Sequence, residues 1–206
     1  MELSCYFPVW DQLTQDQQAQ LTGAAVCRKA KKDTLLHSGS ADCLGLLMVE
    51  SGQLRAYILS DEGREITIYR LLERDICLLS ASCMMKGARF AVAVEAEKDS
   101  SLWIIPSEAY RQVTARSAPL ANYTNELMAG RFSDVMWMMQ QILFMGADRR
   151  VAIFLWDETA GKGRTSLSMT HDEIARNIGS AREVVSKVLK YLAEEGAVAL
   201  GRGRVE

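Results

Sequence analysis

The sequence predicts an α+β protein: an N-terminal antiparallel β-roll (a cupin-like jelly roll), then one long helix, then a winged helix-turn-helix. Three observations predict this order. Short apolar runs separated by turn residues fill residues 24–106, which indicates strands. Apolar residues keep helical spacing through 119–144, and residues 169–192 form two helical patterns joined at one glycine. We therefore expect the roll in residues 1–118, the long helix and a hinge in 119–146, and the winged helix-turn-helix in 147–206.

Length and composition allow one large domain or two small ones. The chain has 206 residues, of which 49% are apolar, as is ordinary for a globular protein. It contains no run of 18 apolar residues, and its first residues, MELSCYFPVW, lack the pattern of a signal peptide. We expect a cytoplasmic protein without a membrane partner. The five cysteines, at positions 5, 27, 43, 77 and 83, form no CxxC pair and are interpreted as free thiols.

The N-terminal part predicts one short helix followed by strands. Residues 9–21 fit a helix in which Thr14 is the N-cap. Further on, Leu54, Ala56 and Ile58 alternate with polar positions, and residues 60–63 fit a hairpin turn. Several short strands at this spacing indicate a small antiparallel roll or barrel.

The long helix is predicted after a short one that begins at Pro106. It runs from Pro119 to Phe144 and carries a wide apolar stripe: Leu120, Leu127, Phe132, Val135, Met136, Met139, Ile142 and Leu143. Packing against the same chain is one interpretation of the stripe. However, a helix of about 25 residues rises roughly 37 Å, which exceeds what a small roll covers, so a second partner is expected. Residues 146–148 are the predicted hinge, and a packed helix is predicted from Arg149 to Trp156.

The helix-turn-helix prediction is carried by residues 169–192. Thr170 and Glu173 have the spacing of a capping box, Gly179 supplies the turn, and Ser180 is the predicted cap of the second helix. In the first helix the predicted core residues are Ile174, Ala175 and Ile178, and in the second they are Val184, Val185, Val188, Leu189 and Leu192. The exposed face of the second helix then holds Arg182, Glu183, Ser186, Lys187 and Lys190. Plain helical bundles show the same pattern, so it does not by itself establish DNA binding.

The following residues predict a wing. Residues 197–200 alternate weakly as a strand, and Gly201-Arg202-Gly203-Arg204 forms a basic hairpin tip whose arginines suit phosphate contacts. The chain stops at Glu206, which leaves open whether closing residues of the wing are missing. From Arg149 onward there are ten Lys/Arg and eight Asp/Glu, against fourteen and eighteen before it. This mild asymmetry supports a nucleic-acid partner for the C-terminal part.

Residues 170–205, THDEIARNIGSAREVVSKVLKYLAEEGAVALGRGRV, resemble the winged helix-turn-helix of the Crp/Fnr regulators, with Arg182, Glu183, Val185 and Lys187 at the core of the recognition helix. The order of the remaining elements agrees, from about Phe7 to Val205. The resemblance implies an effector-binding roll, a parallel homodimer formed by the long helix, and regulation of transcription through double-stranded DNA and RNA polymerase. It does not show whether transcription rises or falls, although activation is the expectation.

For DNA reading, the resemblance implies a palindromic site with half-sites related to TTGA or GTGA. Arg can span guanine O6 and N7, and Glu can accept from a cytosine amine. We expect DNA contacts from these residues: Thr170, Ser180, Arg182, Glu183, Ser186, Lys187, Lys190, Arg202 and Arg204.

The resemblance leaves the effector open. Cyclic-nucleotide binders of the family carry Gly-Glu and Arg-Ser/Thr-Ala motifs, but this chain has Glu73-Arg74-Asp75 and Phe90-Ala91-Val92 at those places. Burying a phosphate without a cation is costly, which disfavours cAMP. Ser80 stands where haem sensors carry histidine, and the cysteine spacing disfavours an iron–sulfur cluster. His37 and His171 are interpreted as solvent-facing or structural.

An apolar or small effector pocket is predicted from six residues: Cys77, Ser80, Cys83, Phe90, Val135 and Met136. Cys77 and Cys83 fit core packing, a redox or metal role, or the lining of a ligand pocket. No metal ligand is assigned.

An enzyme is not indicated. No paired carboxylate, Ser-His or Cys-His arrangement recurs at workable spacing, and AGKGRTSL lacks the glycine spacing of a phosphate-binding loop. The alternative to a regulator is a ligand or redox sensor of the same fold that has lost DNA binding.

Overall fold

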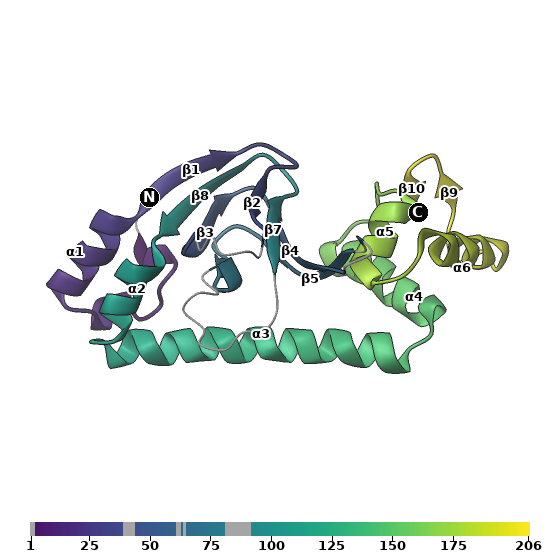
Figure 1. Ribbon diagram of the computed structural model, residues 1–206. Coiled ribbons are helices and arrows are strands. Elements are labelled where there is room, and N and C mark those ends of the chain that lie inside the picture. Colours follow the sequence, from purple (N-terminus) through teal and green to yellow (C-terminus); the bar gives the residue numbers. More distant parts are fainter. Residues whose placement is uncertain (1–2, 39–43, 61–62, 64, 81–91) are drawn as a thin grey trace. The chain divides into compact units, whose positions relative to one another are not determined.

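The computed structural model describes residues 3–38, 44–60, 63, 65–80 and 92–206 (Figure 1). The chain divides into two compact units, which are considered separately. The roll unit comprises Met1–Leu59 and Ile68–Asp134, and the winged-helix unit comprises Ser60–Thr67 and Val135–Glu206.

The predicted antiparallel roll is confirmed, and it consists of two four-stranded sheets. One has the strand order β1-β8-β3-β6 and the other β2-β7-β4-β5. The strands are β1 (Val26–Ala30), β2 (Leu35–His37), β3 (Leu46–Ser51), β4 (Leu54–Leu59), β5 (Glu65–Leu71), β6 (Ile76–Cys77), β7 (Ala93–Ala96) and β8 (Ser100–Ile105). The pairings β1–β8, β3–β8 and β4–β7 are antiparallel.

The interior of the roll is apolar. Leu47, Val94 and Leu102 are among its fully buried residues. Strand β4 departs from the predicted alternation, because Arg55 is only 3% exposed and Tyr57 is also buried. The Arg55 guanidinium lies 4.1 Å from the centre of the Tyr57 ring, and its Nη2 lies 2.8 Å from Glu95 Oε1. Arg55 can therefore be buried on this strand, because its charge is paired with Glu95 and covered by the Tyr57 ring.

Helices flank the roll at its N-terminal end and after its last strand. They are the 3₁₀ turns η1 (Leu3–Cys5) and η2 (Trp10–Gln12), α1 (Gln15–Ala24) and α2 (Ser107–Thr114). Thr14 caps α1 through a capping box with Gln17, so the predicted cap is confirmed. The predicted single helix over residues 9–21 is wrong, because Leu13 and Thr14 have extended ψ angles and this break separates η2 from α1.

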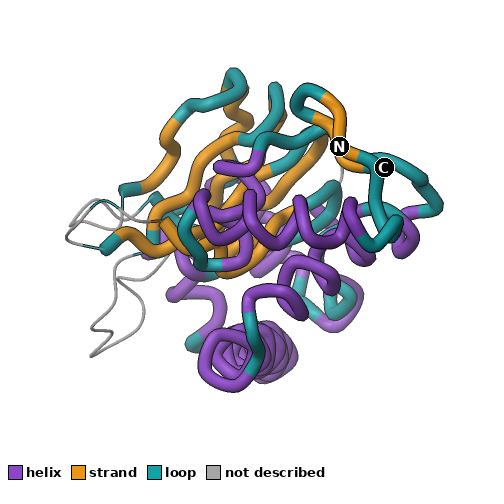
Figure 2. Tube along the Cα trace, turned by 90° about the vertical axis from the view of Figure 1, so that its right-hand side faces the viewer, coloured by secondary structure: helices purple, strands orange, loops and turns teal. Residues whose placement is uncertain are grey.

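The long helix α3 (Ala118–Phe144) is confirmed; Figure 2 views it nearly end-on. Its first half packs on the roll unit: Leu120 is buried with Phe7 and Tyr110, and the Tyr123 hydroxyl donates to the Tyr6 carbonyl at 3.0 Å. The later part of the predicted stripe is exposed, with Phe132 at 68% and Met136, Met139 and Leu143 also open.

The winged-helix unit contains α4 (Ala147–Glu158), η4 (Ala160–Lys162), α5 (His171–Ile178), α6 (Arg182–Glu194), β9 (Leu200–Gly201) and β10 (Arg204–Val205). Val151, Ile174, Val185 and Leu189 are fully buried in its core. The break between α3 and α4 is shorter than the predicted hinge, because Gly146 is the N-cap of α4 and residues 147–148 are already helical. The first wing strand begins at Leu200 rather than at residue 197.

Within the described residues, no helix has the length and apolar character needed to cross a membrane.

Candidate nucleic-acid interface

Helix α5 begins as the sequence predicted. The Thr170 Oγ1 accepts a hydrogen bond from the Glu173 amide at 3.2 Å, and Glu173 Oε2 accepts from the Thr170 amide at 2.6 Å. The Thr170 hydroxyl also lies 2.8 Å from the same carboxylate oxygen. Thr170 was predicted to contact DNA, and the structure shows its side chain engaged in this cap. Ile174, Ala175 and Ile178 are buried behind it.

The turn between the two helices depends on Gly179. This residue has a φ of +62°, in the left-handed region, which glycine adopts without steric cost. The Ser180 amide then donates to the Ala175 carbonyl at 3.0 Å, and this bond keeps Ser180 in the turn. The prediction that Ser180 caps the second helix is therefore wrong: α6 begins at Arg182, and its N-cap is Ala181, which has no side-chain bond.

Helix α6 carries the predicted polar face. Arg182, Glu183, Lys187 and Lys190 are exposed and Ser186 is partly exposed. Val185 and Leu189 are fully buried, with Val188 and Leu192 packed against the same core. Val184 was predicted to be buried, but it is 39% exposed. At 100° per residue, Val184 lies about a quarter turn from Val185 and falls on the flank of the exposed face.

Two contacts that position α6 could not be predicted from sequence spacing. His171, the first residue of α5, places Nδ1 2.8 Å from the Ser186 Oγ of α6. Arg150 of α4 donates from Nη1 to the carbonyl of Ile178 at 2.6 Å and to that of Gly179 at 3.4 Å. The sequence signal for these residues was only a histidine beside a cap and a basic residue at the start of a helix.

The wing is a hairpin whose tip is Arg202 and Gly203. Its two strands pair Arg204 with Gly201 and Val205 with Leu200, and Gly203 has a φ of +68°. The two predicted phosphate-binding arginines differ in their surroundings. Arg204 Nη2 lies 2.7 Å from Glu206 Oε1, whereas the exposed Arg202 has no ion pair within the part of the chain that the structure describes.

Of the six predicted effector residues, the structure describes Cys77, Ser80, Val135 and Met136. Cys77 is fully buried in the roll core, with Sγ 3.5 Å from the Tyr69 hydroxyl. Burial raises the pKa of Tyr69 well above its ordinary value, and Cys77 raises it further. Ser80 donates to the carbonyls of Gly45 and Cys77 at 2.7 and 2.9 Å. Cys83 and Phe90 lie outside the described residues.

Val135 and Met136 lie on α3, the former partly and the latter 40% exposed. A groove of about 320 Å³ runs nearby along α3, but neither residue lines it. The groove is lined by Tyr123, Glu126, Leu127, Gly130, Arg131 and Asp134, all on α3. Arg131 pairs with Asp134 at 3.1 Å, and its guanidinium lies 4.4 Å from the centre of the Tyr69 ring.

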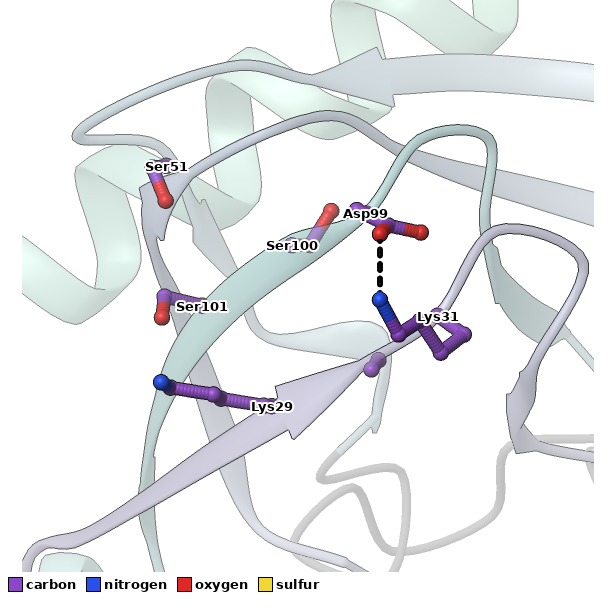
Figure 3. Close-up of a pocket in the computed structure, with 7 residues that line it drawn as sticks. Lys29, Lys31, Ser51, Asp99, Ser100 and Ser101 are labelled. Atoms are coloured by element: carbon purple, nitrogen blue, oxygen red, sulfur yellow. Dashed lines mark hydrogen bonds and ion pairs between the residues drawn. The ribbon is translucent and has the colours of Figure 1, made fainter.

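A second cavity, of about 300 Å³, lies at the turn between β7 and β8 (Figure 3). Lys29, Ser51 and Ser101 line it from three neighbouring strands. Lys31 also lines it but is already paired with Asp99 at 2.7 Å. Among the residues that the structure describes, no three His, Cys, Asp or Glu side chains are placed to hold a metal ion.

Together, the capped α5, the glycine turn, the exposed polar face of α6 and the hairpin after it define a winged helix-turn-helix protein, the class that binds DNA through the second helix. Its other unit is a roll followed by a long helix. The chain belongs to the Crp/Fnr family of transcriptional regulators, as comparison with known proteins shows.

The family model described as "Crp-like helix-turn-helix domain" matches residues 149–206, and the one described as "Cyclic nucleotide-binding domain" matches residues 27–117. The chain is 33% identical over 161 residues to the "Cyclic AMP receptor protein" of Thermus thermophilus, covering 78% of this chain and 74% of the relative. It is 26% identical over 178 residues to the "Transcriptional activator protein anr" of Pseudomonas aeruginosa, covering 83% and 72%.

A solved structure of a Crp/Fnr-family regulator from Eubacterium rectale is 54% identical, with a TM-score of 0.92, and the match covers 97% of this chain and 93% of that one. The c-di-GMP responsive regulator CLP of Xanthomonas campestris shares the fold at 20% identity and a TM-score of 0.78, with 93% and 98% covered. The names of these proteins point to different effectors, so membership of the family does not specify the effector of this chain.

Proposed function

We propose that this chain acts as a homodimer that reads a palindromic DNA site and regulates transcription there. The observation that carries the proposal is the division of α6: Val185 and Leu189 are fully buried, while Arg182, Glu183 and Lys187 are exposed. Arg and Glu at the start of such a helix can contact guanine and cytosine edges in the major groove.

The homodimer is supported by the exposed stripe of α3. Phe132, Met136, Met139 and Leu143 are spaced by four, three and four residues, which is the a/d spacing of a coiled coil. Leaving these side chains in water is unfavourable, and a parallel partner helix would cover them. A two-fold dimer then matches a palindrome whose half-sites are about one helical turn, roughly 34 Å, apart.

The test is DNA binding by the full chain to a palindrome with TTGA or GTGA half-sites, compared with the same duplex with its half-sites shuffled. Specific binding is at least about 10³-fold tighter than non-specific binding in typical regulators. Equal affinity for the two duplexes would contradict the proposal and favour a sensor that has lost DNA binding. The exposed Arg182 and Glu183 argue against that alternative.

We place the effector between the roll and α3. The groove along α3 supports an effector with an anionic or hydrogen-bonding group, because Arg131 lines it and also contacts Tyr69 of the roll. Oxidation of a cysteine thiol is the competing candidate, since the Cys77 Sγ is hydrogen-bonded to the hydroxyl of the same Tyr69. Comparing DNA binding in reductant and after mild oxidation distinguishes them, with Cys77→Ser and Cys83→Ser alongside. A change in affinity that disappears in these variants favours the thiols, and equal binding favours a small ligand.

Such a regulator would work in the cytoplasm, where bacterial DNA lies. Contact with RNA polymerase at the bound promoter is the expected route by which it changes transcription.

A further inference from the structure

His171 and Ser186 form a pair that joins the start of α5 to the exposed face of α6. The His171 Nδ1 lies 2.8 Å from the Ser186 Oγ, and either atom can be the donor. His171 is partly exposed, and its other ring nitrogen, Nε2, has no hydrogen-bond partner among the described residues. Ser186 lies within the proposed DNA-reading face, between Glu183 and Lys187. The His171 imidazole is therefore hydrogen-bonded to a hydroxyl that faces the base edges in the proposed complex.

The protonation state and the tautomer of the imidazole together decide which atom of this pair donates. A serine hydroxyl has one hydrogen and two lone pairs. When Nδ1 of a neutral imidazole accepts that hydrogen, only lone pairs of Oγ remain for a base. When the ring is protonated, both of its nitrogens donate. Nδ1 then donates to Oγ, and the Ser186 hydrogen becomes free for a base.

The two states match different bases. Adenine N6 and cytosine N4 donate in the major groove, whereas guanine O6 and N7 and thymine O4 accept. A Ser186 that can only accept favours an adenine or cytosine amine, and a Ser186 with a free hydrogen favours guanine or thymine. We propose that His171 is a specificity-determining residue: it sets, through Ser186, which base the recognition helix prefers at one position, and that preference changes with pH. This inference rests on the proposed DNA reading by α6.

Charged side chains on three helices, α5, α6 and α4, surround His171. On α5, Asp172 lies 3.5 Å from Arg176 and Glu173 is bonded to Thr170. Helix α6 packs against α5, and its Lys190 and Glu194 lie 3.8 Å apart. The other charged side chains of α6 are Arg182, Glu183 and Lys187.

On α4, Arg150 is hydrogen-bonded to the opposite end of α5, and Glu158 is paired with Lys162. The other charged residues of α4 are Asp148, Arg149 and Asp157. No carboxylate forms an ion pair with His171 within the described residues.

The experiment measures base preference rather than overall affinity, because an imidazolium near phosphates raises affinity for any sequence. Four palindromes differ only at the base pair that loses discrimination in Ser186→Ala. The full chain is titrated with each at about pH 5.5 and about pH 8, the range in which histidine changes charge. We compare the affinity for adenine or cytosine, which present an amine in the major groove, with the affinity for guanine or thymine, which present acceptors there. We expect the ratio of these affinities to change roughly fivefold between the two pH values.

His171→Gln is the main variant, because glutamine can hydrogen-bond but does not titrate in this range. It should keep one base preference at both pH values, whereas Ser186→Ala should show no preference at this base pair at either pH. The chain has only one other histidine, so His37→Leu is the matched control. His37 is 4% exposed, and neither ring nitrogen has a partner in the described structure, so leucine leaves no bond broken there. The His37→Leu variant should retain the pH-dependent preference.

Two results would overturn the inference while leaving the proposed function intact. One is a specific binder whose base preference is the same at both pH values. The other is a pH-dependent preference that persists in His171→Gln. A protein that bound no palindrome more tightly than shuffled DNA would instead overturn the proposed function, and this inference with it.

Discussion

Arg150 Nη1 donates to the carbonyl of Ile178 across 2.6 Å, so that α4 holds the last turn of α5. The end of a helix leaves carbonyls without intrahelical partners, and a cation is the favourable partner there. Because Ile178 directly precedes the Gly179 turn, the direction in which α6 leaves α5 depends on a side chain from another helix.

Arg150→Met should therefore destabilise the winged-helix unit. Hydrogen bonds to a charged group contribute about 1.5–3 kcal/mol, and a loss of that size should lower the urea midpoint of the full chain. Arg149→Met is the matched control, because the Arg149 side chain is exposed and makes no hydrogen bond or ion pair within the described structure. Equal midpoints for the two variants would show that the bond contributes little.

Arg182→Ala and Glu183→Ala should reduce base discrimination. Each loss is expected to cost roughly 1–3 kcal/mol per half-site, measured as affinity for the palindrome relative to single-base variants of it. Glu195→Ala serves as control, because Glu195 is also exposed but lies just beyond the other end of α6. Unchanged discrimination in Arg182→Ala would mean that α6 presents a different face to the bases.

Arg202→Ala should weaken DNA binding about equally for all sequences. If its guanidinium binds a phosphate, the slope of log affinity against log salt should fall by about 1 for each phosphate that the variant no longer neutralises. Arg204→Ala should change the slope less, because Arg204 is already paired with Glu206 at 2.7 Å. A larger change for Arg204 than for Arg202 would contradict this assignment.

Phe132→Asp should convert the proposed dimer to a monomer. The phenyl ring is 68% exposed in the single chain, and an aspartate at a coiled-coil core position would bury an unpaired charge. Ser133→Asp adds the same charge at the next, exposed residue and should leave the mass unchanged. Sedimentation or light scattering reports the difference, and a Phe132→Asp dimer would show that α3 pairs through another face.

Buried tyrosines should make the roll sensitive to alkali. Burial raises the pKa of Tyr110 from its ordinary 10.0 to about 12, and its hydroxyl lies 2.7 Å from Thr124 Oγ1. The folded state thus holds this proton more tightly than the unfolded chain. The resulting stability is present below pH 10 and is lost as the pH rises towards 12. Tyr110→Phe should lose less stability between these values in urea unfolding; an equal loss would assign the alkaline sensitivity elsewhere.

The sequence predicted best what depends on neighbouring residues. The Thr170–Glu173 capping box and the left-handed Gly179 follow from local chemistry, and both are confirmed. The strands of the roll and the long helix follow from hydrophobic spacing. The exposed face of α6 was predicted for the same reason, except at Val184, where a strict apolar-is-buried rule fails at the flank of the helix.

Long-range contacts could not be predicted from the sequence. His171 and Ser186 are separated by 15 residues and Arg150 and Ile178 by 28, so these pairs arise only from how the helices pack. Ser180 was misassigned because serine is a good helix cap, while the backbone bond to Ala175 that keeps it in the turn leaves no mark in the sequence. Arg131 was missed since it stands within a helical pattern that its apolar neighbours explain.

Val184 gives α6 an exposed hydrocarbon surface that its charged neighbours lack. Hydrogen-bonding groups distinguish donors from acceptors, but they do not register the methyl group that thymine carries in the major groove. A valine whose hydrocarbon is 39% exposed beside Glu183 can be covered by that methyl. In the proposed complex with DNA, a thymine beside Val184 is then not interchangeable with a base that offers the same acceptor and no methyl.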